Sequence, residues 1–123
     1  RSSGPGGERT EAVEDFVADG GGRLVLDVSY DEAKRDTAYT AATRPHAHHY
    51  TILAVAAARR DGELRVAATG LKPHAVRLTA VEQGGDASAA LAGIEAQDDP
   101  LASGWYRAQV LPKLVERALA DLS

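Results

Sequence analysis

The stretch RPHAHHYTILAVAAARR, residues 44–60, decides the fold of this chain. Its central part, residues 50–58, carries no charge and has aliphatic or β-branched side chains at nearly every position. Such a run is typical of a strand that is covered on both faces, or on one face and an edge. The pair Asp61-Gly62 follows, and then the alternating run ELRVAATG. Because an Asp-Gly pair readily adopts the two positive φ angles of a two-residue turn, the sequence predicts a β-hairpin at the centre of the domain.

Length and composition limit the class of protein. A chain of 123 residues is long enough for one modest hydrophobic core. The formal net charge of −4 is spread along the sequence, so we expect neither a nucleic-acid partner nor an anionic membrane surface. The absence of cysteine excludes disulfides, thiolate nucleophiles, iron–sulfur ligation and Cys-type zinc sites. The longest uncharged apolar run, about ten residues, is too short to span a bilayer, and we expect a cytoplasmic protein. Because the first residue is Arg, we also expect a processed product or a piece of a longer chain.

The N-terminal part is predicted to have little regular structure ahead of a strand at residues 23–30. Residues 1–9 are rich in Ser, Gly and Pro, and a short helical turn is expected within residues 8–17. Three glycines at 20–22 end that helix. A phosphate-binding loop is disfavoured there, because a strand and not a helix follows the glycines. Residues 23–30, RLVLDVSY, alternate between two faces and predict a strand with one face on a core.

Shorter elements flank the central hairpin. Residues 31–36 predict a charged loop, and residues 37–43 predict a strand of small side chains that leads into the hairpin. Residues 70–77 predict a turn region that contains a proline. The Thr-x-x-Glu spacing of residues 79–82 is that of a capping box and favours a short helix near 79–83. The alternation of apolar residues just before it would also fit a strand.

Two further helices are predicted towards the C-terminus. Asp86 is the expected cap of a helix over residues 87–97. Asp99-Pro100 supplies the cap and first residue of the last helix, which Pro112 should bend or split. Strands followed by helices predict an α+β fold, namely an antiparallel sheet of three to four strands with a C-terminal bundle of about three helices on one face.

The search for chemistry finds one cluster of imidazoles, His46, His48 and His49. On a strand, His46 and His48 would share a face and could converge on a metal, but no carboxylate lies close in sequence to complete the site. Because two ligands rarely hold a divalent ion, we favour another interpretation over a metal site: a polar segment at the start of the strand that lies at a subunit or domain contact. One functional hypothesis is therefore a freestanding module that binds a protein partner or a metal through these histidines. Ser103 lacks the elbow pattern of a nucleophile.

Four segments, taken in order, resemble the C-terminal region of the FAD-binding subunit of the molybdenum hydroxylases, the family of xanthine dehydrogenase and carbon monoxide dehydrogenase. The segments are LVLDVSY (24–30), AYTAATRPHAHHYTILAVAAA (38–58), TGLKPHAVRLTAVE (69–82) and ASGWYRAQVLPKLVERAL (102–119). They resemble the closing strand of the flavin domain, the tyrosine-to-arginine segment with its apolar strand, the pattern that ends the hairpin, and the terminal Tyr-Arg helix. Each segment is weakly specific alone, and the ordered set is more specific.

The resemblance implies a division of the chain into two parts. Residues 1–30 would be a loose N-terminal segment and the closing strand of an upstream flavin-binding domain. Residues 31–123 would be a domain like the C-terminal domain of the carbon monoxide dehydrogenase flavoprotein, with a structural and docking role. FAD would be held mainly by loops that precede this chain, so the isolated chain is not expected to bind FAD well or to catalyse. The implied partners are that flavin-binding portion and the molybdopterin and iron–sulfur subunits.

The resemblance also implies three positions near the flavin. Thr40 stands where relatives carry a lysine near the isoalloxazine, and Val25 matches a flavin-facing position of the closing strand. Arg44 keeps the arginine that precedes the apolar strand, whereas His49 replaces the family's usual Asp. Loss of the lysine removes a charge that would influence the reduced, anionic flavin.

Overall fold

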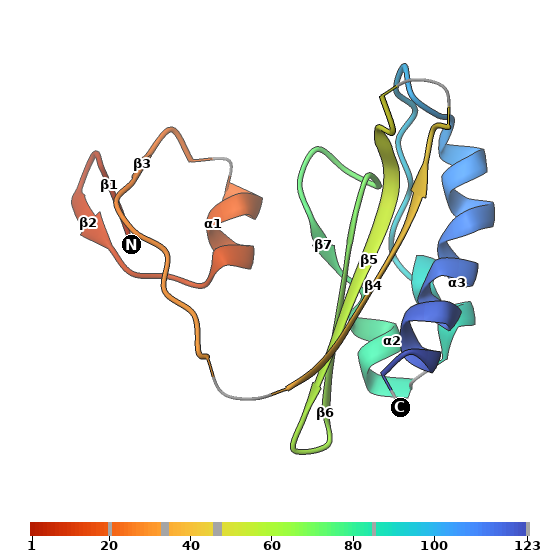
Figure 1. The fold of residues 1–123 in the computed structure, drawn as a ribbon. Coiled ribbons are helices and arrows are strands. Elements are labelled where there is room, and N and C mark those ends of the chain that lie inside the picture. The colour runs from red at the N-terminus through yellow and green to blue at the C-terminus, as the bar shows by residue number, and fades with distance from the viewer. Residues whose placement is uncertain (20, 33–34, 46–47, 85, 123) are drawn as a thin grey trace. The chain divides into compact units, whose positions relative to one another are not determined.

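The structure is a computed structural model, and it describes residues 1–19, 21–32, 35–45, 48–84 and 86–122. The chain divides into two compact units, Arg1–Ala33 and Lys34–Ser123, and each is described by itself (Figure 1). Among the described residues, no helix is long and apolar enough to cross a membrane.

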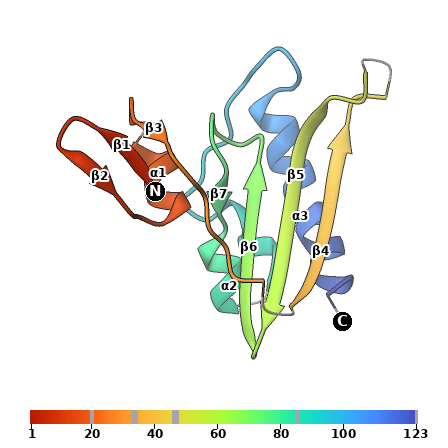
Figure 2. The same cartoon turned by 60° about the vertical axis from the view of Figure 1, so that its left-hand side comes forward.

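The second unit is a four-stranded antiparallel sheet with helices on one face (Figures 1 and 2). Its strands, in the order in which they pair, are β4 (Asp36–Thr43), β5 (Thr51–Arg60), β6 (Glu63–Thr69) and β7 (Val76–Arg77). Its helices are α2 (Thr79–Gly84), the 3₁₀ helix η1 (Ala87–Leu91) and α3 (Gly104–Ala120). Helix α3 packs on β4 and β5, and α2 packs on β6. The predicted α+β class, with an antiparallel sheet and C-terminal helices, is confirmed.

The predicted central hairpin is confirmed in its strands and in its turn. Strands β5 and β6 pair antiparallel along the whole of β6. Between them, Asp61 has φ 50° and Gly62 has φ 82°, which are the two left-handed conformations that a two-residue turn of this kind requires. The hairpin therefore closes as the Asp-Gly pair predicts.

A β-bulge explains why the start of β5 shows no alternation of buried and exposed residues. Strands β4 and β5 pair in register as far as Ala42 opposite Leu53, but Thr43 then lies opposite Thr51. Ile52 is thus one extra residue on β5, and such an insertion interrupts the alternation of faces. In agreement, both Ile52 and its neighbour Leu53 belong to the buried core.

The core lies between the sheet and its helices. Fully buried side chains come from the strands, the helices and the loops that join them: Leu53, Val55, Val66, Leu71, Leu78, Val81, Leu111 and Val115. Thr40 of β4 faces this layer, and its Oγ1 donates a 2.9 Å hydrogen bond to the carbonyl oxygen of Leu114 in α3. Because side chains alternate along a strand, Tyr39 and Ala41 lie on the opposite face, which these helices leave open.

The predicted second helix is shorter than expected. Asp86 caps it as predicted, because its Oδ1 accepts a 2.8 Å hydrogen bond from the Ser88 N–H. However, the element is a 3₁₀ helix that ends at Leu91, so the prediction of a helix over residues 87–97 is wrong. Gly93 adopts φ 72° just after it, a conformation that interrupts a right-handed helix.

The last helix begins later than predicted and does not split. Asp99-Pro100 is not its start, because α3 begins at Gly104. Ser103 is the cap, and its Oγ accepts a 3.2 Å hydrogen bond from the Tyr106 N–H. The helix then continues through Pro112 as one element of 17 residues.

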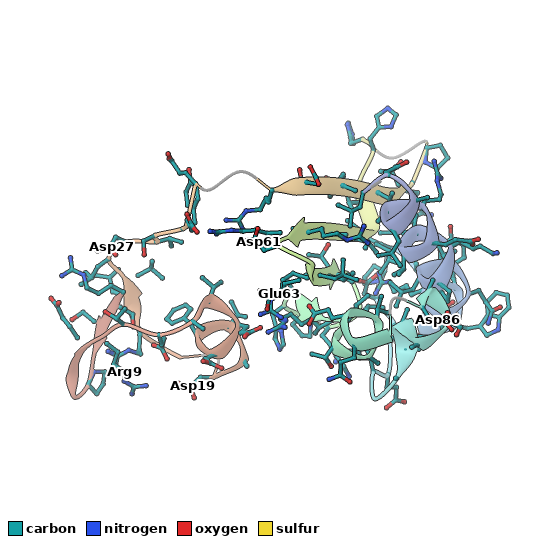
Figure 3. The ribbon with its side chains drawn as sticks, turned by 90° about the horizontal axis from the view of Figure 1, so that it is seen from below. Arg9, Asp19, Asp27, Asp61, Glu63 and Asp86 are labelled. Atoms are coloured by element: carbon teal, nitrogen blue, oxygen red, sulfur yellow. The ribbon has the colours of Figure 1, made fainter. Side chains whose placement is uncertain are left out.

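The first unit departs most from the sequence prediction. Its elements are β1 (Ser2–Gly4), β2 (Gly7–Arg9), α1 (Val13–Asp19) and β3 (Leu24–Val25). Residues 1–9 are not loose, because β1 and β2 pair antiparallel. Of the predicted strand 23–30 only β3 forms, and among the described residues of this unit only Ser2 is buried. A strand needs a core for its apolar face, and this unit does not supply one. Figure 3 shows Arg9 and Asp19, whose Nη1 and Oδ2 atoms lie 3.9 Å apart.

Candidate functional site

The open face of the sheet carries a shallow hollow of about 520 Å³, which is the candidate site of the second unit. Its floor consists of small side chains, because Ala56 of β5 lies between Tyr39 of β4 and Ala67 of β6 in the pairing register. Tyr39 stands above this floor with an exposed fraction of 65%. The rim is basic on the β6–β7 side, where Arg65 and Arg77 line the hollow. The site thus combines a flat apolar floor, an exposed aromatic ring and guanidinium groups.

Glu82 of α2 closes the hollow at the β6–β7 side. Its Oε1 accepts hydrogen bonds from the Val66 N–H at 2.9 Å and from Arg77 Nε at 3.1 Å, and its Oε2 accepts from Arg77 Nη2 at 2.5 Å. Arg65 Nη1 lies 3.8 Å from Oε2. The Glu82 side chain is only 7% exposed. The glutamate of the predicted capping box therefore binds the sheet, and this contact ties α2 to β6 and β7.

The surroundings of Glu82 favour its ionised form. Burial by itself would raise the pKa of Glu82, but the hydrogen bonds from Arg77 and from the Val66 N–H act in the opposite direction. Together with the positive charges of Arg77 and Arg65, they hold the pKa of Glu82 below its ordinary value of 4.5. The carboxylate is therefore a fixed negative charge at neutral pH.

Because the pKa of Glu82 is lower in the folded state, its contribution to stability is present above its unfolded pKa and is lost as the pH falls through the folded value. We predict that Glu82→Gln lowers the free energy of unfolding by about 2 kcal/mol at pH 7, since hydrogen bonds to a charged group are lost. The variant should also lose less stability than the parent when the pH falls below about 5. Urea denaturation at several pH values measures both effects.

A matched control for this prediction is Glu63→Gln. The Glu63 side chain is 64% exposed and pairs with Arg65 on the surface. Surface ion pairs contribute little, so the free energy of unfolding of this variant should stay within about 0.5 kcal/mol of the parent's. Parallel pH profiles for the parent and Glu82→Gln would contradict the proposed role of Glu82.

The structure places the three predicted flavin positions in different surroundings. Thr40 is 8% exposed, and its hydroxyl is already bonded to α3. Arg44 is exposed just after β4, where its N–H donates a 3.0 Å hydrogen bond to the Tyr50 carbonyl oxygen. Val25 belongs to the first unit and is 48% exposed. It lines an apolar hollow of about 270 Å³ together with Val13, Phe16, Val17 and Val28. The flavin contacts of all three residues stay predictions.

His48 and His49, the described members of the histidine cluster, do not lie on a strand. His46 lies outside the described residues. His48 and His49 lie in a turn ahead of β5 with φ 51° and 54°, so the prediction that His48 presents its ring from a strand is wrong. The His48 ring instead packs edge-on to Tyr50, with centroids 6.2 Å apart. In the part of the chain that the structure describes, no three His, Asp or Glu residues are placed to hold a metal ion.

The sequence prediction did not identify the side chains of the hollow. Tyr39, Arg65 and Arg77 come from three different strands, and pairing brings them to one face. One signal was available, because alternation along residues 37–43 and 63–70 assigns every second residue to a common face. The register between the strands, and with it the hollow, required the structure.

Comparisons with known proteins support the fold. No protein-family model matches the chain, and no curated protein matches it in sequence. Among solved structures, a chain of quinoline 2-oxidoreductase from Pseudomonas putida 86 matches with a TM-score of 0.60 over 81% of this chain, at 14% sequence identity. The matched region covers 39% of that protein's chain, so the present chain corresponds to about two fifths of it. At this identity, the likeness concerns the fold.

Proposed function

We propose that this chain is the C-terminal portion of an FAD-binding oxidoreductase subunit of molybdenum hydroxylase type. Residues 31–123 act as a structural and docking domain that flanks the flavin, and residues 1–30 form the end of the flavin-binding domain. The observation that carries the proposal is the fold likeness to an oxidoreductase chain over 81% of the present chain. The ordered sequence segments that resemble the same class of subunit give independent support.

The first unit has the surface of an incomplete domain. Large apolar side chains of residues 24–30 are exposed to fractions between 40% and 79%: Leu24, Val25, Leu26, Val28 and Tyr30. Five such side chains within seven residues are more than isolated surface apolar residues, and such a concentration supports an interaction surface. The occupant that we propose is the flavin-binding portion of the same subunit. It would cover residues 24–30 and supply the core that the first unit lacks.

In the second unit, we assign the flavin side to the region around Arg44. Its side chain is exposed, and a guanidinium group can stabilise the negative charge of a reduced flavin. Val25 is the proposed contact in the first unit. Thr40 could approach the flavin only if its hydroxyl gave up its hydrogen bond to α3. We therefore propose that Thr40 contributes less to flavin binding than Arg44 and Val25. Because the open alanine face is flat and free of helices, it is the proposed docking surface for the molybdopterin or iron–sulfur subunit.

Retention of FAD tests the proposal. Three forms would be compared. They are the 123-residue chain, an extended chain that includes the flavin-binding portion proposed to precede Arg1, and a shortened form of that extended chain that ends before Lys34. FAD supplies the redox chemistry, and the protein supplies binding and orientation. We expect the 123-residue chain alone to bind FAD weakly, the extended chain to retain it, and the shortened form to release it more readily. Equal retention by the extended and shortened forms would remove the proposed role.

A further inference from the structure

Strand β4 leaves an unpaired edge on the sheet. In the described part of the chain, β4 pairs with β5 alone, and it is eight residues long. The other edge strand, β7, has only two residues. Sheets usually protect a long edge with charges, prolines or bulges. Strand β4 has one charged residue, Asp36, and no proline, and the extra residue of the bulge lies on β5.

We propose that this edge pairs with β4 of a second copy of the chain, antiparallel and about a two-fold axis at Thr40. In such a pair, positions equally far before and after Thr40 lie opposite each other. Asp36 then faces Arg44 of the other copy, and the symmetry makes this pair twice. Tyr39 faces Ala41 of the other copy on the open face, and an aromatic ring beside a small residue is a favourable cross-strand neighbour.

Two charges, Asp36 at the start of β4 and Arg44 just after its end, select this register over others. Asp36 and Arg44 are both exposed, and neither makes an ion pair with another described residue, although Arg59 lies opposite Asp36 within the sheet. A shift of one residue would turn every side chain of one copy to the other face of the sheet. A shift of two residues would move both charges away from their partners. Only the arrangement centred on Thr40 brings the opposite charges together.

The helices leave room for this arrangement. Helix α3 contacts both β4 and β5, so it lies over these two strands. Neighbouring strands are about 4.8 Å apart, which puts the two α3 helices of a paired dimer about 10 Å from each other. Packed helices have axes about 8–10 Å apart, so the two α3 helices would lie at the upper end of that range. The second copy would thus extend both the sheet and the helical layer.

This inference does not rest on the proposed function, and the two can be told apart. Arg44 serves either the flavin or the second copy, so the pairing is proposed for the 123-residue chain on its own. Sedimentation equilibrium of that chain should show a mass that rises with concentration towards twice 12.9 kDa. Asp36→Arg should weaken the association at least tenfold, because it places like charges opposite each other at two positions. The double variant Asp36→Arg/Arg44→Asp should restore it to within about threefold, since the charge pair is only exchanged.

A cross-link tests the register directly. The chain has no cysteine, so Tyr39→Cys/Ala41→Cys introduces the only thiols. Directly opposed residues have the separation that a disulfide requires, and we expect this double variant, but not Tyr39→Cys alone, to form a covalent dimer on oxidation. Leu26→Asp, in the exposed apolar stretch of the first unit, should leave the association unchanged. A monomer at all concentrations, an association that Leu26→Asp abolishes, or no rescue by the charge exchange would each overturn the proposal, while FAD retention by the extended chain would be unaffected.

Discussion

Replacing Gly70 by alanine is expected to lower the free energy of unfolding of the second unit by about 4 kcal/mol. Gly70 has φ 91°, and a Cβ atom there would collide with the carbonyl oxygen of Ile52. Ile52 is the extra residue of the β-bulge, so the backbone at this point is held by the pairing of β4 with β5 and by the core. Neither partner can move away without loss of these contacts. Urea denaturation followed by far-ultraviolet circular dichroism measures the change.

Gly62→Ala is the matched control for Gly70→Ala. Gly62 has a similar φ, 82°, but a Cβ atom there meets no other atom within 4 Å. This variant therefore reports the backbone strain alone, which should be about 1 kcal/mol. The difference between the two variants isolates the close approach of Gly70 to the bulge. Equal destabilisation by both substitutions would show that the contact with Ile52 is unimportant.

Replacing Arg107 by alanine is the second substitution from which we expect a large effect, a loss of about 3 kcal/mol in the free energy of unfolding. Arg107 lies in α3 and is 2% exposed. Its Nη1 donates a 3.0 Å hydrogen bond to the Gln97 carbonyl oxygen, and its Nη2 donates a 2.6 Å hydrogen bond to Asp99 Oδ2. The side chain thus holds the loop ahead of α3 against the helix. Removal leaves a cavity beside α3 and breaks both of these hydrogen bonds.

Packing is the larger part of this effect. The Asp99 side chain is 40% exposed, so it can be hydrated when Arg107 is absent and is not left as a buried unpaired charge. Arg107 Nε, moreover, is buried without a hydrogen-bond partner among the described residues, which reduces what the guanidinium group contributes. Arg107→Met keeps most of the buried volume and should therefore lose about half as much stability as Arg107→Ala.

Two further measurements separate packing from charge at Arg107. The hydrogen bond from Arg107, together with those from the Leu101 and Ala102 N–H groups, holds the pKa of Asp99 below its ordinary value. In Arg107→Met the pKa of Asp99 should therefore rise, which NMR titration can follow. Lys113→Ala is the surface control: Lys113 is 79% exposed, and its loss should change stability by less than about 0.5 kcal/mol. An Arg107→Ala variant as stable as Lys113→Ala would contradict the structural role of Arg107.

Local chemistry was enough to predict the hairpin and the cap at Asp86, because each depends on neighbours in the sequence. The short helix at Thr79 also forms, although the glutamate of its motif does not make the local contact on which the prediction relied. The hairpin turn needs two positive φ angles, and Asp61-Gly62 supplies them wherever the strands pack. The cap at Asp86 is equally local, because its carboxylate accepts a hydrogen bond from the N–H group of Ser88, two residues further along the chain. The α+β class was predicted from the order of strands and helices along the chain.

Features that depend on distant partners could not be predicted. The glutamate of the Thr-x-x-Glu motif had a local partner available, but Glu82 binds Val66 and Arg77 on neighbouring strands. Asp99 had the position of a helix cap, yet its carboxylate is bound by Arg107 and by the N–H groups of a turn. The strand predicted over residues 23–30 is reduced to two residues, because the described residues of the first unit form no core that would cover its apolar face. For Glu82 and Asp99, a tertiary contact replaced the local preference.

The central claim, that this chain is the C-terminal portion of a flavoprotein subunit, is tested most directly by the dissociation constant of FAD. It would be measured by isothermal titration for the polypeptide extended ahead of Arg1, with and without residues 34–123. We expect the complete form to bind FAD at least tenfold more tightly, a difference of about 1.4 kcal/mol or more, because one side of the flavin is otherwise left in water. Equal dissociation constants for the two forms, or no FAD binding by either, would contradict the claim.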